Sequence, residues 1–201
     1  MVIGVSGVAG SGKDLFSNAL THELESKGKR VFRLSIAQAL KEEVREWCVG
    51  QYGIDPTNCS REDKEKIRQL LVFHGTIKRN KTKGRHWLEI TNSIIEELKD
   101  NYDYFIISDI RYSDYERDEV PWLKKELGGV LIHVQLYWVE GRLNGLKKVF
   151  QEPANSEEKR NDPKLLKACD HDVTWEKFDD INKDKYTKEY AVKCSEWLNT
   201  L

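Results

Sequence analysis

Short apolar runs alternate with longer stretches of helical periodicity along the chain. Runs of strand length lie at residues 2–6, 30–35, 104–108, 130–137 and 171–175. Helical spacing of apolar positions lies at residues 14–26, 37–49, from Ser60 onward, 86–98, 114–127 with a break near Pro121, and 188–198. Strands that alternate with helices predict an α/β fold, with a central, mostly parallel sheet between two helical layers.

Two polar stretches interrupt this pattern. Residues 78–85 are basic and predict a solvated loop, and residues 140–160 are charged and too long for a tight connection. No internal repeat, low-complexity tract or linker divides the sequence. We therefore expect residues 1–201 to form a single domain.

The composition is that of a soluble, ordered protein. The sequence is 39% hydrophobic and 33% charged, with a formal net charge of -1. A protein that coats duplex nucleic acid needs a basic excess, so we expect no stable nucleic-acid partner. No apolar run approaches the roughly 18 residues that cross a bilayer, so no membrane association is expected. The first residues lack the basic segment of a signal peptide, and the four cysteines form no CxxC pair; both observations predict a reduced, cytoplasmic protein without a zinc site.

The strongest motif is a glycine-rich loop between the first strand and the first helix. Its residues are Gly7, Val8, Ala9, Gly10, Ser11, Gly12, Lys13 and Asp14. This sequence matches G-x-x-x-x-G-K, the pattern of a phosphate-binding P-loop. Backbone amides can surround a phosphate closely only where side chains are absent, and the helix N-terminus adds the positive end of its dipole. Lys13 supplies a cation for the β- and γ-phosphates of ATP.

Asp14 departs from the motif, which has Ser or Thr after the lysine to bind Mg²⁺. One interpretation is that Asp14 binds the metal directly or through water. The other is a degenerate loop that binds phosphate without catalysis. A role as a helix cap is the alternative if the metal role fails.

A second polar group follows the apolar run at residues 104–108. Asp109 lies where this strand is expected to end, and ligands gather at the carboxyl ends of strands in such sheets. An acidic group there commonly holds Mg²⁺ opposite the P-loop, and Arg111 is close enough to bind phosphates. The simpler alternative is that Asp109 only caps the next helix.

These residues carry a family resemblance. The Gly-Lys-Asp ending of the loop and the segment Ser108-Asp109-Ile110-Arg111 resemble phage-type deoxynucleoside monophosphate kinases and animal-type phosphomevalonate kinases. The resemblance implies a three-layer P-loop NTPase fold of the nucleoside monophosphate kinase type, an active loop, and ATP with Mg²⁺ as cofactors. Residues 68–87 and the run Asn161-Asp162-Pro163 are more similar to the phage kinases than to the phosphomevalonate kinases.

A kinase of this kind holds two charged phosphates in line, so it needs basic side chains from several segments. We predict Lys41, Arg68 and Arg79 as acceptor-binding residues within a helical insertion at about residues 36–100. Trp87 is predicted to stack on an acceptor base. Residues 139–160 are predicted to form a lid, with Arg142 as its catalytic arginine. Each of these side chains has an ordinary alternative role on a surface or in the core.

The predicted reaction is transfer of the ATP γ-phosphate to a (deoxy)nucleoside monophosphate. Lys13, Arg111 and Arg142 would spread the developing charge, while Asp14 and Asp109 would hold Mg²⁺. The alternatives are a kinase for phosphomevalonate or another small phosphate, a kinase for a modified base or end in DNA, and a non-catalytic nucleotide-binding module. The expected location is the cytoplasm, that of the host cell if the gene belongs to a phage, and a homodimer is an open possibility.

Overall fold

The computed structural model describes residues 1–141, 146–178 and 182–201. Its strands are β1 (Val2–Ser6), β2 (Val31–Leu34), β3 (Tyr104–Ile110), β4 (Val130–Glu140), β5 (Lys147–Phe150) and β6 (His171–Glu176). They form one sheet in the order β2-β3-β1-β4-β5, and β6 pairs with β4. Among the described strands, all pairings are parallel except β4 with β5. The predicted α/β fold with a mostly parallel sheet is confirmed.

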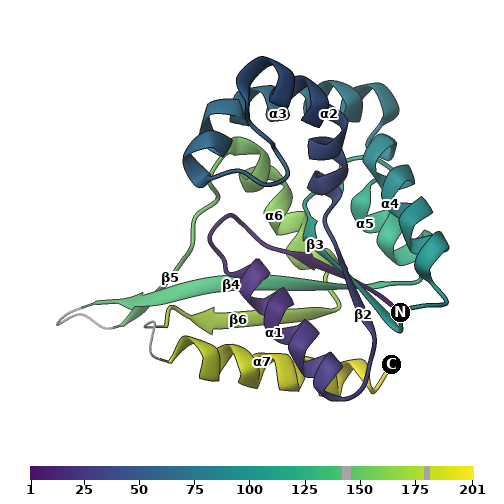
Figure 1. The fold of residues 1–201 in the computed structure, drawn as a ribbon. Helices are drawn as coiled ribbons and strands as arrows, with labels where there is room; N and C mark the ends of the chain where they lie inside the picture. The colour runs from purple at the N-terminus through teal and green to yellow at the C-terminus, as the bar shows by residue number, and fades with distance from the viewer. Residues whose placement is uncertain (142–145, 179–181) are drawn as a thin grey trace.

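Helices cover both faces of the sheet (Figure 1). They are α1 (Lys13–Ser26), α2 (Ile36–Tyr52), α3 (Arg61–Thr82), α4 (Arg85–Leu98), α5 (Glu119–Pro121) with the π-helical turn η1 (Trp122–Glu126), α6 (Ser156–Ala168) and α7 (Lys183–Leu198). Helices α1 and α7 pack on one face, and α2, α4, η1 and α6 lie on the other. The sheet is therefore the middle of three layers.

The alternation of side chains along the strands builds two separate cores. On β1, Ile3 and Val5 pack toward α1 and α7, while Val2 packs toward the opposite helices. On β3, Ile106 joins the first group, and Phe105 joins the second. This period of two is expected of strands that are covered on both faces.

Two sequence expectations are wrong in this part of the chain. Residues 78–85 are not a solvated loop, because α3 continues to Thr82 and α4 starts at Arg85. A turn at Lys83 (φ 50°) and Gly84 (φ 86°) is enough to separate the two helices. The helix expected over residues 114–127 begins only at Glu119, because the Asp118 carboxylate accepts hydrogen bonds from the amides of Asp114 and Tyr115 and holds them in a turn.

The charged stretch at residues 140–160 also contains regular structure. Strand β5 folds back on the end of β4, pairing Tyr137 with Phe150 and Glu140 with Lys147. Helix α6 then begins at Ser156 and continues past Pro163 to Ala168, where no helix was expected. The segment predicted as a lid therefore comprises a β-hairpin and the first turns of a helix, apart from residues 142–145, which lie outside the described part.

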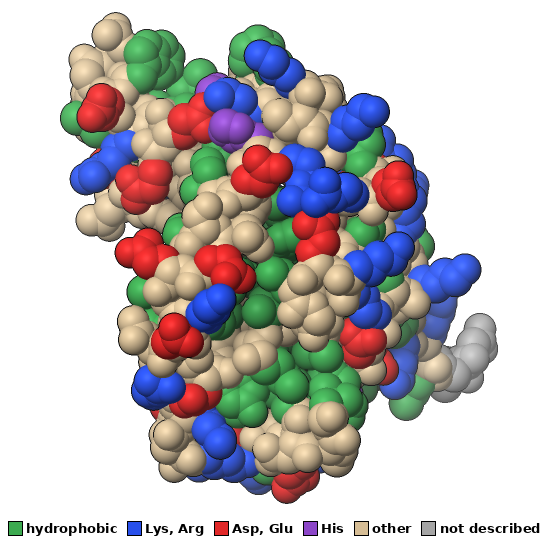
Figure 2. All heavy atoms as spheres, turned by 90° about the vertical axis from the view of Figure 1, so that its right-hand side faces the viewer, with side chains coloured by type: hydrophobic (Ala, Val, Ile, Leu, Met, Phe, Trp, Pro, Cys, Tyr) green, Lys and Arg blue, Asp and Glu red, His purple; other side chains and the backbone are tan. Residues whose placement is uncertain are grey.

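The surface carries charges of both signs. Figure 2 shows acidic and basic side chains interspersed over the face on the right-hand side of Figure 1, where α4 and α5 lie, rather than gathered by sign. A search of the described residues finds no helix with the length and apolar character needed to cross a membrane.

Candidate active site

The phosphate loop leaves β1 at Ser6 and enters α1 at Lys13. Gly7, Gly10 and Gly12 have φ angles of 143°, 81° and 88°, which side chains other than glycine rarely adopt. The Ser11 hydroxyl is buried and has no hydrogen-bond partner among the described residues. Open backbone, a helix N-terminus and an unpaired buried hydroxyl are features that fit a phosphate group.

Trp175 supports this loop from beneath. Its indole Nε1 donates a hydrogen bond of 2.9 Å to the carbonyl oxygen of Ser11, and its ring is 1% exposed. A Cβ on Gly12 would lie 2.6 Å from this ring, so only glycine fits there. Trp175 belongs to β6, which is far from the loop in sequence, and its hydrogen bond holds the loop in place above the sheet.

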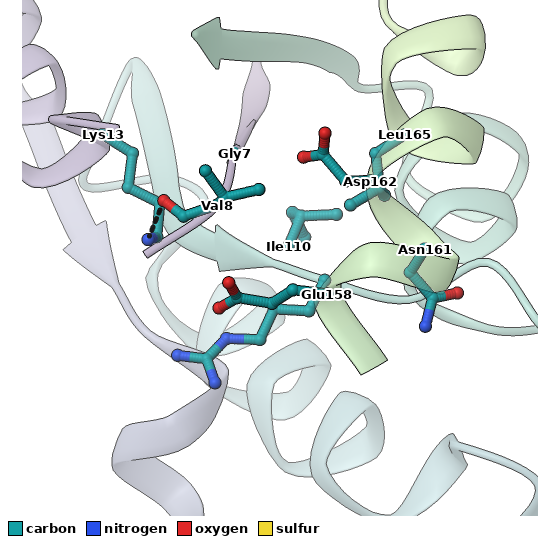
Figure 3. A pocket seen from close by; sticks show the side chains of 9 residues that line it. Gly7, Val8, Lys13, Ile110, Glu158, Asn161, Asp162 and Leu165 are labelled. Carbon is teal, nitrogen blue, oxygen red and sulfur yellow. Dashed lines mark hydrogen bonds between the residues drawn. The ribbon is translucent and has the colours of Figure 1, made fainter. Parts of the chain in front are cut away.

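Lys13 and Arg111 line one cavity beside the loop (Figure 3). The other residues that line it are Gly7, Val8, Ile110, Glu158, Asn161, Asp162 and Leu165. Strands β1 and β3 are paired, with Ser6 opposite Ile110, so the residues that follow the two strands meet at one edge of the sheet. The structure thus brings together the two cations that the sequence predicted for phosphate binding.

The Lys13 side chain turns back toward its own loop, with Nζ 3.4 Å from the Val8 carbonyl oxygen. Burial lowers the pKa of Lys13, and the charge of Arg111 lowers it further. The carboxylates of Asp14, Glu158 and Asp109 raise it in partial compensation. Two neighbouring cations in a partly dry cavity are electrostatically unfavourable until an anion joins them.

Asp109 lies at the end of β3 and binds the start of α2. Its Oδ1 accepts the amide of Ile36 (2.7 Å), and its Oδ2 accepts the amide of Ala37 and the hydroxyl of Ser35 (both 2.8 Å). A carboxylate offers about four lone-pair directions, so one remains for another ligand. Asp109 therefore joins the sheet to the helical insertion, and its predicted metal role is compatible with that single free direction.

Asp14 is exposed in the first turn of α1. Among the described residues, no group of three or more His, Cys, Asp or Glu side chains is arranged to hold a metal ion. This fits Mg²⁺ in kinases, which is usually bound through one or two carboxylates together with substrate phosphates. Asp14 and Asp109 are the residues that would hold it, and their metal roles stay predictions.

The predicted acceptor residues lie on α2, α3 and α4. Lys41 is half-buried on α2, and Arg68 is exposed on α3, where Nε donates to Glu65 at 2.8 Å. Trp87 is 6% exposed and packs within the core between the sheet and the helices. Its ring offers little free surface for a base. None of these three side chains is among the residues that line the cavity beside the loop, and their acceptor roles stay predictions.

Arg79 has a partner that the sequence did not reveal. Its guanidinium donates two hydrogen bonds, of 2.7 and 2.6 Å, to the fully buried carboxylate of Asp118, and it lies 3.7 Å from the centre of the Tyr112 ring. Desolvation would lower the pKa of Arg79, but Asp118 raises it above its ordinary value. The bidentate pair links α3 to the segment after β3, so Arg79 has a structural role independent of any acceptor.

The backbone at Arg111 is held by a buried acid, while the Arg111 side chain is exposed. Glu119 accepts hydrogen bonds from the backbone amides of Arg111 and Tyr112, the latter at 3.0 Å. Burial raises the pKa of Glu119 to about 8, against the opposing effect of the Arg111 amide. Arg142, the predicted lid arginine, lies outside the described residues.

Helix α6 contributes polar residues that the sequence analysis assigned to no site. Glu158, Asn161 and Asp162 face the cavity beside the loop (Figure 3). Asp162 lies 3.5 Å from Nε2 of the buried His133, whose Nδ1 is 2.9 Å from the hydroxyl of Ser6. Burial lowers the pKa of His133 to about 4, so the ring is neutral at neutral pH. Spacing along α6 could have revealed this face only if the helix itself had been predicted.

A family model described as phosphomevalonate kinase matches residues 5–128 of the chain. A search of curated proteins finds no match. Solved structures of similar shape include dephospho-CoA kinase from Campylobacter jejuni, at 13% identity and a TM-score of 0.49, covering 98% of this chain and 96% of that one. Shikimate kinase from Acinetobacter baumannii, in complex with shikimate, matches at 10% identity and a TM-score of 0.44, covering 99% and 93%. Shikimate kinase from Aquifex aeolicus matches at 12% and 0.42, covering 100% and 99%.

Proposed function

Because this chain belongs to the phosphomevalonate kinase family, we propose that it transfers the γ-phosphate of ATP to the phosphate group of a small acceptor. The observation that carries the proposal is the meeting of Lys13 and Arg111 in one cavity beside the glycine loop. Phosphoryl transfer requires positioning and charge stabilisation more than covalent chemistry, and two preorganised cations provide both.

The residues have separate tasks in this proposal. Amides of the loop and the start of α1 bind the phosphates of ATP, and Gly7, Gly10 and Gly12 leave room for them. Lys13 and Arg111 stabilise the negative charge on the transferred group. Mg²⁺, held through Asp14 and Asp109, would neutralise further charge on the β- and γ-phosphates.

A phosphorylated aliphatic acid of the phosphomevalonate kind is the acceptor that we favour. Family membership supports it, and so do the surroundings of Trp87 and Tyr112. Trp87 belongs to the core, and one face of the Tyr112 ring is covered by the Arg79 guanidinium, whereas Phe73 on α3 is 66% exposed. An aliphatic acceptor needs no exposed ring, whereas a nucleobase gains about 1–3 kcal/mol from stacking on one.

A deoxynucleoside monophosphate is the second candidate. The run Asn161-Asp162-Pro163 resembles phage nucleotide kinases and lies beyond the family match at residues 5–128. Asn161 and Asp162 line the cavity, and the buried Oδ1 of Asn161 has no hydrogen-bond partner among the described residues. This unpaired amide oxygen is available to a hydrogen-bond donor of a polar acceptor.

An acceptor panel tests the proposal. ADP release would be measured with ATP and Mg²⁺, in the presence of phosphomevalonate, each deoxynucleoside monophosphate, duplex DNA, or no acceptor. We expect stimulation by phosphomevalonate; stimulation by nucleotides alone would favour the second candidate. Stimulation by DNA alone would indicate a DNA kinase. Tight ATP binding with no turnover for any acceptor would indicate a non-catalytic nucleotide-binding module, and Lys13→Ala serves as the inactive control.

A further inference from the structure

A carboxylate from α6 reaches into the phosphate loop. Oε2 of Glu158 accepts a hydrogen bond of 3.1 Å from the backbone amide of Ala9, a residue 149 positions earlier in the chain. Ala9 is the third residue of the glycine-rich motif, within the loop whose amides are proposed to bind ATP. An anionic side chain thus occupies one of the donors that a phosphate oxygen would use.

Helix capping explains part of this arrangement but not all of it. The Asn155 side chain accepts the Glu158 amide (2.9 Å), and Glu158 Oε2 accepts the Ala154 amide (3.0 Å), which together form a reciprocal cap at the start of α6. Such a cap needs no contact outside its own helix. The additional bond to Ala9 couples the cap to the phosphate loop.

The charged side chains of α6 also place negative charge on the side of the phosphate loop. Glu158 and Asp162, one turn apart, face the cavity that holds Lys13 (Figure 3). Arg160 and Lys164 face away from it and bind the carboxylate of Asp114, at 2.9 and 2.6 Å. The helix therefore presents its acids, and not its bases, to the place where nucleotide phosphates are expected.

We propose that Glu158 competes with ATP for the phosphate loop: its carboxylate binds the Ala9 amide in the empty protein and leaves when the phosphates of ATP bind. The inference rests on the proposed function to the extent that ATP uses this loop. The competition is direct because one amide hydrogen cannot serve two anions, and because like charges repel strongly in a partly desolvated cavity. Before ATP binds, the carboxylate of Glu158 thereby offsets positive charge at the phosphate loop.

The contact should raise the apparent Kd for ATP. The size of the rise depends on the fraction of molecules in which Glu158 binds the Ala9 amide. If Glu158 is docked in about nine-tenths of empty molecules, the apparent Kd for ATP is raised about tenfold. Glu158→Gln removes the charge but keeps a side-chain oxygen for the cap of α6, since Gln suits that position of a capping box. Glu158→Asp keeps the charge but shortens the side chain by one methylene, which withdraws it from Ala9.

The test measures Kd for a non-hydrolysable ATP analogue with Mg²⁺ by isothermal titration calorimetry, without acceptor. We expect Glu158→Gln to bind about tenfold more tightly than the unmodified protein, and Glu158→Asp to bind more tightly as well. Glu196→Gln, at an exposed position near the end of α7, is the control for the loss of one charge, and its affinity should not change. Thermal unfolding of each variant checks that the fold is kept.

Unchanged or weaker binding by Glu158→Gln would overturn the inference, and so would an equal gain in Glu196→Gln, which would indicate a general effect of net charge. These results leave the proposed function standing if the unmodified protein binds the analogue. If neither the unmodified protein nor Glu158→Gln binds it, both the inference and the proposed function fail. Binding by Glu158→Gln alone would be the strongest support.

Discussion

Replacing Asp109 by Asn should uncouple the helical insertion from the sheet. The carboxylate of Asp109 accepts three hydrogen bonds from the start of α2, namely from the amides of Ile36 and Ala37 and from the hydroxyl of Ser35. Both Asp109 and Ile36 are buried, so water cannot replace these bonds easily. Asn has nearly the same shape, and the substitution changes charge and hydrogen bonding without leaving a cavity.

The loss of stability follows from the three bonds. The Asn amide keeps one acceptor oxygen and turns an NH₂ donor toward the amide or the hydroxyl that the other oxygen had served. Leaving a buried donor unsatisfied costs about 1–3 kcal/mol, and bonds to an uncharged oxygen are roughly half as strong as bonds to a carboxylate. We therefore expect a loss of about 2–4 kcal/mol, which lowers Tm by roughly 5–15 °C in a protein of this length.

Calorimetric or circular-dichroism melting of Asp109→Asn against Asp14→Asn measures this effect. Asp14 is also a carboxylate beside the phosphate loop, but it is exposed, so its substitution should cost less than about 1 kcal/mol. Equal melting temperatures for the two variants would refute the coupling of β3 to α2. Ser35→Ala should show part of the Asp109→Asn loss, and the double variant should lose less than the sum.

Three further predictions concern other charged groups. Lys13→Ala should keep the fold and lower turnover by roughly a hundred- to a thousand-fold, measured by ADP release, because one preorganised charge contact is removed; near-normal turnover would contradict the site. Glu43 binds Lys78 at 2.6 Å, and its hydrogen bonds lower its pKa to about 2 from an ordinary 4.5. The stabilising contribution of the Glu43 carboxylate is therefore present above pH 4.5 and is lost as the pH falls toward 2. The difference in the free energy of unfolding between the unmodified protein and Glu43→Gln, measured in urea, should narrow from pH 6 to pH 3. A constant difference would speak against the lowered pKa. Arg79→Met leaves the buried Asp118 unpaired and should cost about 3–5 kcal/mol in chemical denaturation; a loss below 1 kcal/mol would show that the pair is not needed.

Local patterns correctly predicted the glycine-rich connection between β1 and α1 and most of the sheet. The loop at residues 7–14 is defined by short-range requirements, namely glycine at positive φ and a cation at the helix start. Strands β1, β3 and β4 are buried runs whose apolar character is visible without knowledge of their neighbours. The placement of Arg111 in one cavity with Lys13 followed from the rule that parallel strands end at one edge.

The partners of the charged residues could not be predicted, because they come from distant segments. In the sequence, Arg79 looks like any other helical arginine, because only the turn after β3 brings Asp118 to it. Helix α6 was missed because its apolar positions are few and show no clear helical period, and it contains Pro163. Strand β5 was missed for a related reason: it is a four-residue edge strand that pairs with only the end of β4.

The support of the phosphate loop by Trp175 has a consequence for synthesis of the protein. The loop leaves the ribosome well before the indole that supports it, which follows 164 residues later. Strand β6 also lies beyond residues 5–128, so the family-matched segment alone lacks this support. A growing chain should therefore be unable to bind ATP until β6 has emerged, and nucleotide would stabilise only chains that contain this strand. Contacts of such long range also close late in folding, because the entropy of a long loop must be lost before they form.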